Sequence, residues 1–419
     1  MPNYFAKARV LCKTLKKYNP KAKFALVISD DIPSFIDFEK EPFDYLLETK
    51  KSDKIGNKKI FFFKHTITEL CTAVKPLMAL EIMRLYNADK VIYLDPDIAV
   101  FDDLSILESY LDKYSIILTP HQLQPEEKDL YVRENEILFL KRGSFNLGFF
   151  GVKADDEGKR FLNWWNTRLM TYCFDDNYDI LPELMHDGLV GMFTDQKWID
   201  LVPSFFDNYF IIKEPGYNTC TWNLSHRRIK KLNNGKFTVN DKPLYFYHFS
   251  GWDSGGHYNE VEKHLQYYPY NQDVRLLSDW YEKQLKEAEQ DKFGSLKYKN
   301  IYYSNGEKIQ DFERKILHIR KDVYSIFLDP YEVTDGQCYY NWVRSEYKKW
   351  FDYFDDKTAE MYKHNKYKRI IDVFFPVRSK RRIWAKKIYK HFLRIVHNRI
   401  VKNCPPIYLK WRDSMTNHK

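Results

Sequence analysis

The chain has 419 residues, 44% of them hydrophobic and 30% charged, a composition typical of globular proteins that excludes an intrinsically disordered chain. This length allows two or three domains. The formal net charge of +9 comes from residues 376–419, where thirteen Lys and Arg stand against one acid. This tail therefore carries +12, and the other 375 residues sum to −3.

The six cysteines are scattered along the chain: Cys12, Cys71, Cys173, Cys220, Cys338 and Cys404. They form no close pair, which argues against a zinc knuckle or a disulfide framework and suits a reducing compartment. No apolar run approaches the ~20 residues that span a bilayer, and the N-terminus has no signal-peptide core. We therefore expect a cytoplasmic protein.

Helix and strand patterns alternate in the first part of the chain. Apolar residues recur at helical spacing over 7–18 and 73–86, and short apolar runs predict strands at 24–29, 91–94 and 115–120. This alternation predicts a largely parallel α/β sheet, in which ligands bind beyond the carboxyl ends of the strands.

The later part of the chain becomes more polar. Strands are predicted at 145–152 and 237–250, with an amphipathic helix at 159–171 between them. Residues 252–375 have a polar, helical pattern with little sign of strands, and 381–402 place an apolar stripe opposite Lys, Arg and His.

The segment VIYLDPDIAVF carries two carboxylates, Asp95 and Asp97, where a buried strand reaches the surface. Residues two apart on an extended chain point the same way, and Pro96 removes a donor that would compete for a carboxylate. Two hard oxygens suit Mg²⁺ or Mn²⁺. A turn without a metal is the other interpretation of the same residues.

A histidine that follows a later strand pattern could complete such a site. The imidazole of His248 could supply the nitrogen ligand that favours Mn²⁺, although a histidine after an apolar strand is more commonly a hydrogen-bonded core residue. Gly251 would let the backbone pass close to a phosphate.

The order YLDPDI, FNLGFFGV, TDQKWIDLVP, PGYNTCTWNL and HFSG resembles nucleotide-sugar-dependent glycosyltransferases of the GT-A fold, in particular glycosyltransferase family 8 and bacterial relatives that build surface polysaccharides. The resemblance implies a GT-A domain over 1–251, an α/β fold with a Rossmann-like mixed sheet flanked by helices. We expect a mainly helical extension over 252–375 and a basic amphipathic tail over 376–419.

The resemblance also implies roles for single residues. Asp95 and Asp97 would hold Mn²⁺, the first also touching the nucleotide ribose, and His248 would be the third protein ligand. Asn146 would lie near the donor sugar, and Gly251 would lie near a phosphate of the nucleotide.

Further along the chain, Asp195 and Gln196 would touch the sugar hydroxyls and the reacting face, and Tyr217 and Asn218 would lie near the acceptor. A helix cap by Thr194 or Asp195, with Trp198 packed inward, is the other interpretation of TDQKW. Trp222 is expected in the core.

The sequence departs from the family in two places. A lysine after the His-x-x-Gly block normally clamps the diphosphate, whereas here WDSGGHYNEVEKH follows, and we expect Lys263 or His264 to replace it. The family also has a strand before the asparagine-tyrosine stretch that helps to hold the base; either that strand is missing, or the chain starts too far downstream. Lys75-Pro76 predicts a helix start, with a phosphate contact by Lys75 as the alternative.

For the basic tail, a solvated helix and nucleic-acid binding are weaker interpretations than a helix that lies on an anionic membrane surface. We therefore expect peripheral contact with the inner face of the cell membrane and no nucleic-acid partner. The predicted function is a Mn²⁺- or Mg²⁺-dependent glycosyltransferase that moves a sugar from a UDP-sugar to a saccharide or lipid-linked acceptor, with retention. The alternatives are a sugar nucleotidyltransferase, for which the Gly-rich loop is lacking, and a decayed membrane-associated scaffold.

Overall fold

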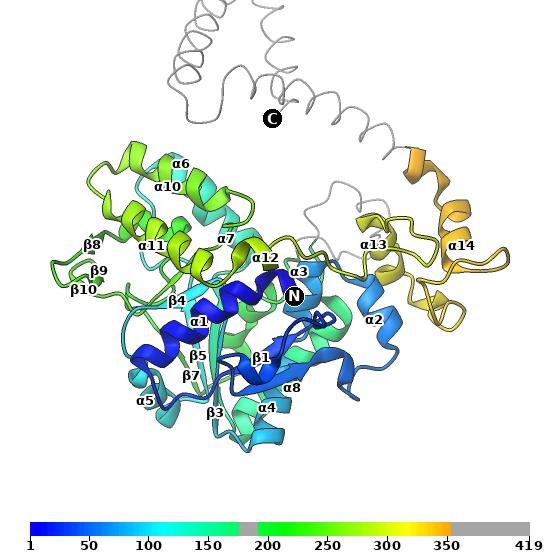
Figure 1. Cartoon of the computed structure of the whole chain (residues 1–419), viewed down its shortest axis with the longest axis horizontal. Helices are drawn as coiled ribbons and strands as arrows, with labels where there is room; N and C mark the ends of the chain where they lie inside the picture. Colours follow the sequence, from blue (N-terminus) through cyan, green and yellow to red (C-terminus); the bar gives the residue numbers. More distant parts are fainter. Residues whose placement is uncertain (176–191, 353–419) are drawn as a thin grey trace, which may run out of the picture. The chain divides into compact units, whose positions relative to one another are not determined.

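The computed structural model describes residues 1–175 and 192–352 (Figure 1). The chain divides into two compact units, Met1–Asn341 and Trp342–Lys419. The first unit continues past residue 251, where the sequence predicts a domain boundary.

The predicted boundary at residue 375 and the basic tail, with its membrane contact, lie outside the described residues. Within the described ranges, no helix combines the length and the apolar content needed to cross a bilayer.

The described strands form four small sheets. Strands β1 and β2 pair in parallel, β4 pairs with β11, and β8, β9 and β10 form an antiparallel meander. The largest sheet has the order β3-β6-β5-β7. The strand bounds are β1 Ala25–Ile28, β2 Tyr45–Glu48, β3 Lys90–Leu94, β4 Ile98–Val100, β5 Ile116–Pro120, β6 Phe145–Lys153, β7 Tyr209–Ile211, β8 Ile229–Lys231, β9 Phe237–Val239, β10 Lys242–Pro243 and β11 Phe246–His248.

The four-stranded sheet is mixed. Strand β6 runs antiparallel to both β3 and β5, whereas β5 and β7 are parallel. The prediction of a largely parallel sheet, made from the alternation of helices and strands, is therefore wrong at β6. The mixed sheet agrees with the one that the resemblance to GT-A glycosyltransferases implies.

Helices cover both faces of this sheet (Figure 1). Alternate residues of a strand face opposite sides, so Val91 and Tyr93 of β3 pack with α4 and α8, whereas Ile92 and Leu94 face α1 and α5. The α-helix bounds are α1 Phe5–Tyr18, α2 Lys58–Lys64, α3 Ile67–Ala73, α4 Lys75–Tyr86, α5 Ser105–Lys113, α6 Asp129–Tyr131, α7 Ile137–Arg142, α8 Asp156–Tyr172, α9 Val202–Phe205, α10 Gly256–Tyr267, α11 Asp273–Glu287, α12 Gln290–Phe293, α13 Asp311–Ile319 and α14 Tyr339–Glu346.

Most predicted elements lie where the patterns placed them, but the predicted strand at 237–250 is broken into β9, β10 and β11. Asn240 and Asp241 have φ values of 50° and 61°, and this left-handed pair makes a tight hairpin between β9 and β10. Because Asn and Asp tolerate this conformation better than other side chains, the turn interrupts an otherwise strand-like pattern.

Strands β1 and β3 each have one neighbour among the described strands, so one edge of each is open. Residues of both strands line a cavity of about 950 Å³. Helices α1 and α4 also line it, and it reaches the carboxyl end of β3, where Asp95 lies.

The fold buries several neutral histidines, and this predicts sensitivity to acid. Burial lowers the pKa of His121 and His318 to about 3 and that of His257 and His264 to about 4, and it lowers the pKa of His65. The unfolded chain binds protons at these rings near pH 6.5, so the free energy of unfolding should fall as the pH drops below 6.5.

Urea denaturation at pH 7, 6 and 5 measures this effect. His264→Gln, whose side-chain amide can still bond Asn271, should reduce this loss of unfolding free energy by roughly 2 kcal/mol at pH 5, because folding lowers the pKa of His264 from 6.5 to about 4. The pKa of His248 is shifted the other way, since Asp97 raises it despite burial, and offsets part of the loss. An unfolding free energy that stays constant from pH 7 to pH 5 would contradict the prediction.

Candidate metal centre and active site

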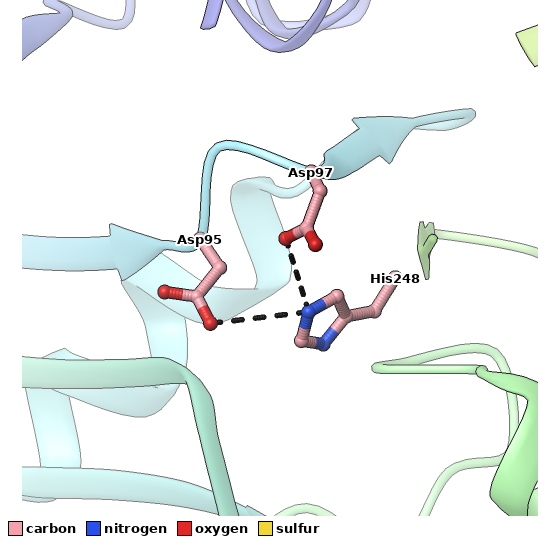
Figure 2. A group of neighbouring side chains, drawn as sticks. All are labelled: Asp95, Asp97 and His248. Atoms are coloured by element: carbon pink, nitrogen blue, oxygen red, sulfur yellow. Dashed lines mark ion pairs between the residues drawn. The ribbon is translucent and has the colours of Figure 1, made fainter. Parts of the chain in front are cut away.

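Asp95, Pro96 and Asp97 form a tight turn between β3 and β4. Pro96 occupies the second position, and the N–H of Ile98 donates to the carbonyl of Asp95 at 3.0 Å. The two carboxylates thus reach one volume through a turn, not through the side-chain alternation of an extended chain (Figure 2). The turn and metal interpretations of this motif are therefore compatible.

His248 is brought to this turn by the pairing of β11 with β4, in which it lies opposite Ile98. The N–H of Phe249 donates to the carbonyl of Asp97 at 2.8 Å, which fixes the backbone on that side. Figure 2 shows the imidazole pointing at both acids: its Nε2 lies 3.1 Å from Oδ1 of Asp97 and 3.8 Å from Oδ2 of Asp95.

The three side chains fit a divalent cation. One donor atom from each lies within 4.8 Å of the others, and atoms 3–4 Å apart can share an ion at bond lengths of roughly 2.1 Å. Asp97 is 8% exposed and the Asp95 side chain 26% exposed, so the group is sheltered but open to the cavity. Two carboxylates and one imidazole are a donor set that suits Mn²⁺.

The electrostatics of the site couple the acids to the histidine. Burial raises the pKa of Asp97, but the charge and hydrogen bond of His248, with Lys7 nearby, outweigh burial and leave this pKa below its ordinary value. Burial lowers the pKa of His248, but Asp97 and Asp95 outweigh it and raise this pKa above 6.5. The site therefore favours positive charge between the two carboxylates.

Gly148 of β6 makes room for the imidazole. A Cβ at this position would lie 2.6 Å from Cε1 and 2.7 Å from Nδ1 of His248, far inside contact distance. The glycine of FNLG therefore has a packing role beside the candidate ligand.

Lys75 starts α4, as the Lys-Pro pattern predicted, and also enters the site. Its ammonium lies 2.9 Å from Asp195, 3.5 Å from Asp95 and donates to the carbonyl of Leu147 at 2.8 Å. Burial works against this charge, but the two carboxylates raise the pKa of Lys75 above its ordinary value. Lys75 thus links the turn at β3 to the Thr194–Gln196 segment.

Asp195 is 2% exposed and lines the cavity, as does Gln196. Burial raises the pKa of Asp195, and Lys75 partly offsets that rise. Neither Thr194 nor Asp195 caps a helix: the 3₁₀ helix that follows has Gln196 at its N-cap without a side-chain bond. Thr194 has the left-handed φ of 43°, a strained conformation for a β-branched residue, and its hydroxyl donates to Asp195.

Asn146 lines the cavity and is fixed by Asn218, whose amide donates to Oδ1 of Asn146 at 2.9 Å. Asn218 and Tyr217 are each 1% exposed, and Tyr217 stacks on Tyr245 with ring centroids 4.1 Å apart. Among the described residues that line the cavity, neither Tyr217 nor Asn218 appears. Asn218 therefore does not line the cavity itself but supports Asn146, which does.

Gly251 has a left-handed φ of 74°, and its carbonyl accepts the N–H of His257 at the start of α10. Lys263 pairs with Glu134 and Glu260, and His264 is buried against Asn271. The described cavity wall includes neither Lys263 nor His264. The loop after Gly251 instead carries Asp253, which holds the buried Lys7 at 2.6 Å.

Several cavity residues had no signal in the sequence. Trp222 was expected in the core but lines the cavity, with its ring 5.4 Å from that of His248 and roughly perpendicular to it. His121 and Arg142 line the same wall. Their positions depend on loops between elements, for which the sequence gives no periodic pattern.

No protein-family model matches the chain. The chain is 25% identical over 188 residues to the uncharacterized protein YfnD of Bacillus subtilis (strain 168), an alignment that covers 45% of this chain and 55% of that protein. It is 27% identical over 189 residues to the uncharacterized protein YfnF of the same organism, covering 44% and 57%. The chain thus spans about half the length of the curated relatives it matches.

Among solved structures, the chain is similar to the crystal structure of a glycosyltransferase involved in the glycosylation of the major capsid of PBCV-1. The TM-score is 0.28 at 10% sequence identity, and the match covers 58% of this chain and 86% of that chain.

The buried pair of Lys75 and Asp195 gives a test of the site's electrostatics. Lys75→Met leaves a buried carboxylate without its counter-charge, so the free energy of unfolding should fall by about 3 kcal/mol or more. The double variant Lys75→Met/Asp195→Asn should lose less than the sum of the single variants in urea denaturation. Lys59→Met, which removes an exposed lysine paired with Asp329, is the control and should cost at most about 1 kcal/mol. Additive effects at positions 75 and 195 would show that the pair is not coupled.

Proposed function

We propose that the chain is a metal-dependent glycosyltransferase that moves a sugar from a nucleotide diphosphate sugar, UDP-linked, to a saccharide or lipid-linked acceptor in surface glycan synthesis. The observation that carries this proposal is the convergence of Asp95, Asp97 and His248 beside a large cavity at the carboxyl end of β3. Ligands of α/β sheets bind at this edge. The basic tail would bring the enzyme to lipid-linked acceptors at an anionic membrane, a prediction that concerns residues outside the described ranges.

A divalent ion such as Mn²⁺ or Mg²⁺, held by the three side chains, would supply Lewis-acid stabilisation of the charge on the departing diphosphate. Lys75 is suited to assist, because it lines the cavity and its ammonium lies 3.5 Å from Asp95. We assign to Lys75 the diphosphate contact that the sequence suggested for Lys263, because the described cavity wall does not include Lys263.

Asp195 and Gln196, which line the cavity, would orient the transferred sugar. Oδ1 of Asp195 accepts the hydroxyl of Thr194 and Oδ2 forms an ion pair with Lys75 at 2.9 Å, and an ammonium that offsets the charge of a carboxylate makes it a weaker nucleophile. This supports attack from the same face as the leaving group, one of the two routes to retention, over a covalent intermediate on Asp195. Asn146 would bind sugar hydroxyls from the β6 side of the cavity.

A thermal-shift panel of UDP-, GDP-, CMP- and dTDP-sugars, with and without Mn²⁺, tests the proposal. The UDP-sugars should raise the melting temperature only with Mn²⁺, by several degrees at roughly 100-fold excess over the dissociation constant. The wild type should also hydrolyse UDP-sugars slowly with Mn²⁺, and Asp97→Ala should abolish both this hydrolysis and the thermal shift. Asp112→Ala, which removes an exposed acid paired with Lys90, should behave as wild type. Binding of a UDP-sugar by Asp97→Ala as tight as wild type would rule out the proposed site.

Gly148→Ala tests the placement of His248 without touching a candidate ligand. The added methyl group collides with the imidazole, so Mn²⁺ affinity measured by calorimetry should fall by about tenfold or more. Gly56→Ala is the matched control, because a Cβ at Gly56 meets nothing within 4 Å. Unchanged Mn²⁺ binding by a folded Gly148→Ala variant would show that His248 is not a ligand of the ion.

A further inference from the structure

Arg142, the last residue of α7, lines the cavity. Within the described residues, its buried Nε has no hydrogen-bond partner and its guanidinium pairs with no carboxylate. The guanidinium lies over the ring of Phe193, 4.8 Å from its centroid. Lys75, by contrast, already has two carboxylates beside it.

The wall of the cavity connects Arg142 with the candidate metal centre. From His248, the next ring is Trp222 at 5.4 Å, then His121 at 5.6 Å from Trp222, and His121 stacks on Phe139 at 4.5 Å. Burial lowers the pKa of His121 and keeps its ring neutral, and the positive charge of Arg142 lowers this pKa further. Nε2 of His121 lies 3.3 Å from the side-chain amide of Asn146, whereas its buried Nδ1 has no hydrogen-bond partner among the described residues.

Arg142 is also tied to the reacting face. The side-chain amide of Gln196 donates to the carbonyl of Arg142 at 3.0 Å. A molecule in contact with Gln196 is therefore close to the end of α7.

The chemistry of this wall indicates the kind of ligand. A partly buried guanidinium without a counter-ion is suited to bind a carboxylate or a phosphate through two parallel hydrogen bonds. The donor diphosphate belongs at Asp95, Asp97 and Lys75. The contacts of Trp222, His121 and Phe139 lead from His248 to α7, the helix that ends at Arg142. Aromatic rings with a few free polar atoms are typical of walls that bind one face of a small organic ligand.

We propose that Arg142 binds an anionic substituent, carboxylate or phosphate, of a sugar that lies along the Trp222–His121 wall. The substrate class is therefore an anionic saccharide, whether the charge belongs to the transferred sugar or to the acceptor. This inference rests on the proposed function for the nature of the bound molecule.

Calorimetric titrations of the full chain in Mn²⁺ test the proposal in two arms. The donor arm compares UDP-glucuronic acid with UDP-glucose, and the acceptor arm compares glucose 6-phosphate with glucose in the presence of UDP. Wild type should prefer the anionic ligand by about tenfold or more in one arm, and Arg142→Gln should abolish that preference. Arg142→Lys should keep part of this preference, because the positive charge remains although the paired N–H donors of the guanidinium are lost.

Lys141→Gln is the matched control, since it removes one exposed positive charge from the neighbouring position, outside the cavity wall, and should keep the wild-type preference. Circular dichroism establishes that the variants are folded.

If UDP binds with Mn²⁺ but neither arm shows a preference that depends on Arg142, this inference fails and the proposed function stands. If glucose 6-phosphate binds in an Arg142-dependent manner while UDP does not bind, the anion site stands and the transferase proposal fails. If none of the ligands binds, both are overturned.

Discussion

Asp95, Asp97 and Asp195 bring three carboxylates into one sheltered region, and like charges repel strongly where water is scarce. Lys75 and His248 offset this repulsion. Lys75 binds Asp195 and lies near Asp95, while the imidazole of His248 lies against Asp97. The arrangement of the cavity depends on this balance, because removing either cation would leave buried acids that protonate or separate. An ion at Asp95, Asp97 and His248 would enter a site that already favours positive charge.

The sequence predicted the elements that frame the site with good accuracy. The helices at 7–18 and 73–86 and the strands at 24–29, 91–94 and 115–120 correspond to α1, α4, β1, β3 and β5. These segments are long or strongly apolar, so local periodicity determines them. The direction of β6 and the break in the strand at 237–250 were missed, because pairing direction depends on distant contacts and the hairpin on two left-handed residues.

The candidate site was predictable where short motifs mark it. Asp95, Asp97 and His248 do come together, and Asn146, Asp195 and Gln196 line the same cavity. The role of Lys75 beside Asp195 was not predictable, because a long side chain bridges residues 120 positions apart. Gly148 could have been suspected from FNLG, but only the position of His248 shows what a side chain there would displace. Arg142 and His121 follow no sequence pattern, because their candidate role depends on contacts that only the fold shows. Within the described residues, Arg142 pairs with no carboxylate and Nδ1 of His121 has no hydrogen-bond partner.

The open edges of β1 and β3 have a consequence for the dynamics of the protein. Peptide groups on these edges have no ladder to join within the described strands, and residues of both strands line the cavity together with residues of α1 and α4. Helices that cover a bare edge protect it from pairing with a foreign chain, as natural sheets require. The amides on these edges can bond only to water, because no neighbouring strand is there to accept their hydrogen bonds. Amides of β1 and of the unpaired edge of β3 should therefore exchange their hydrogens sooner than those of β5 and β6. The strand edges that line the cavity should therefore open more readily than the centre of the four-stranded sheet, and the edge of β3 adjoins the turn that carries Asp95.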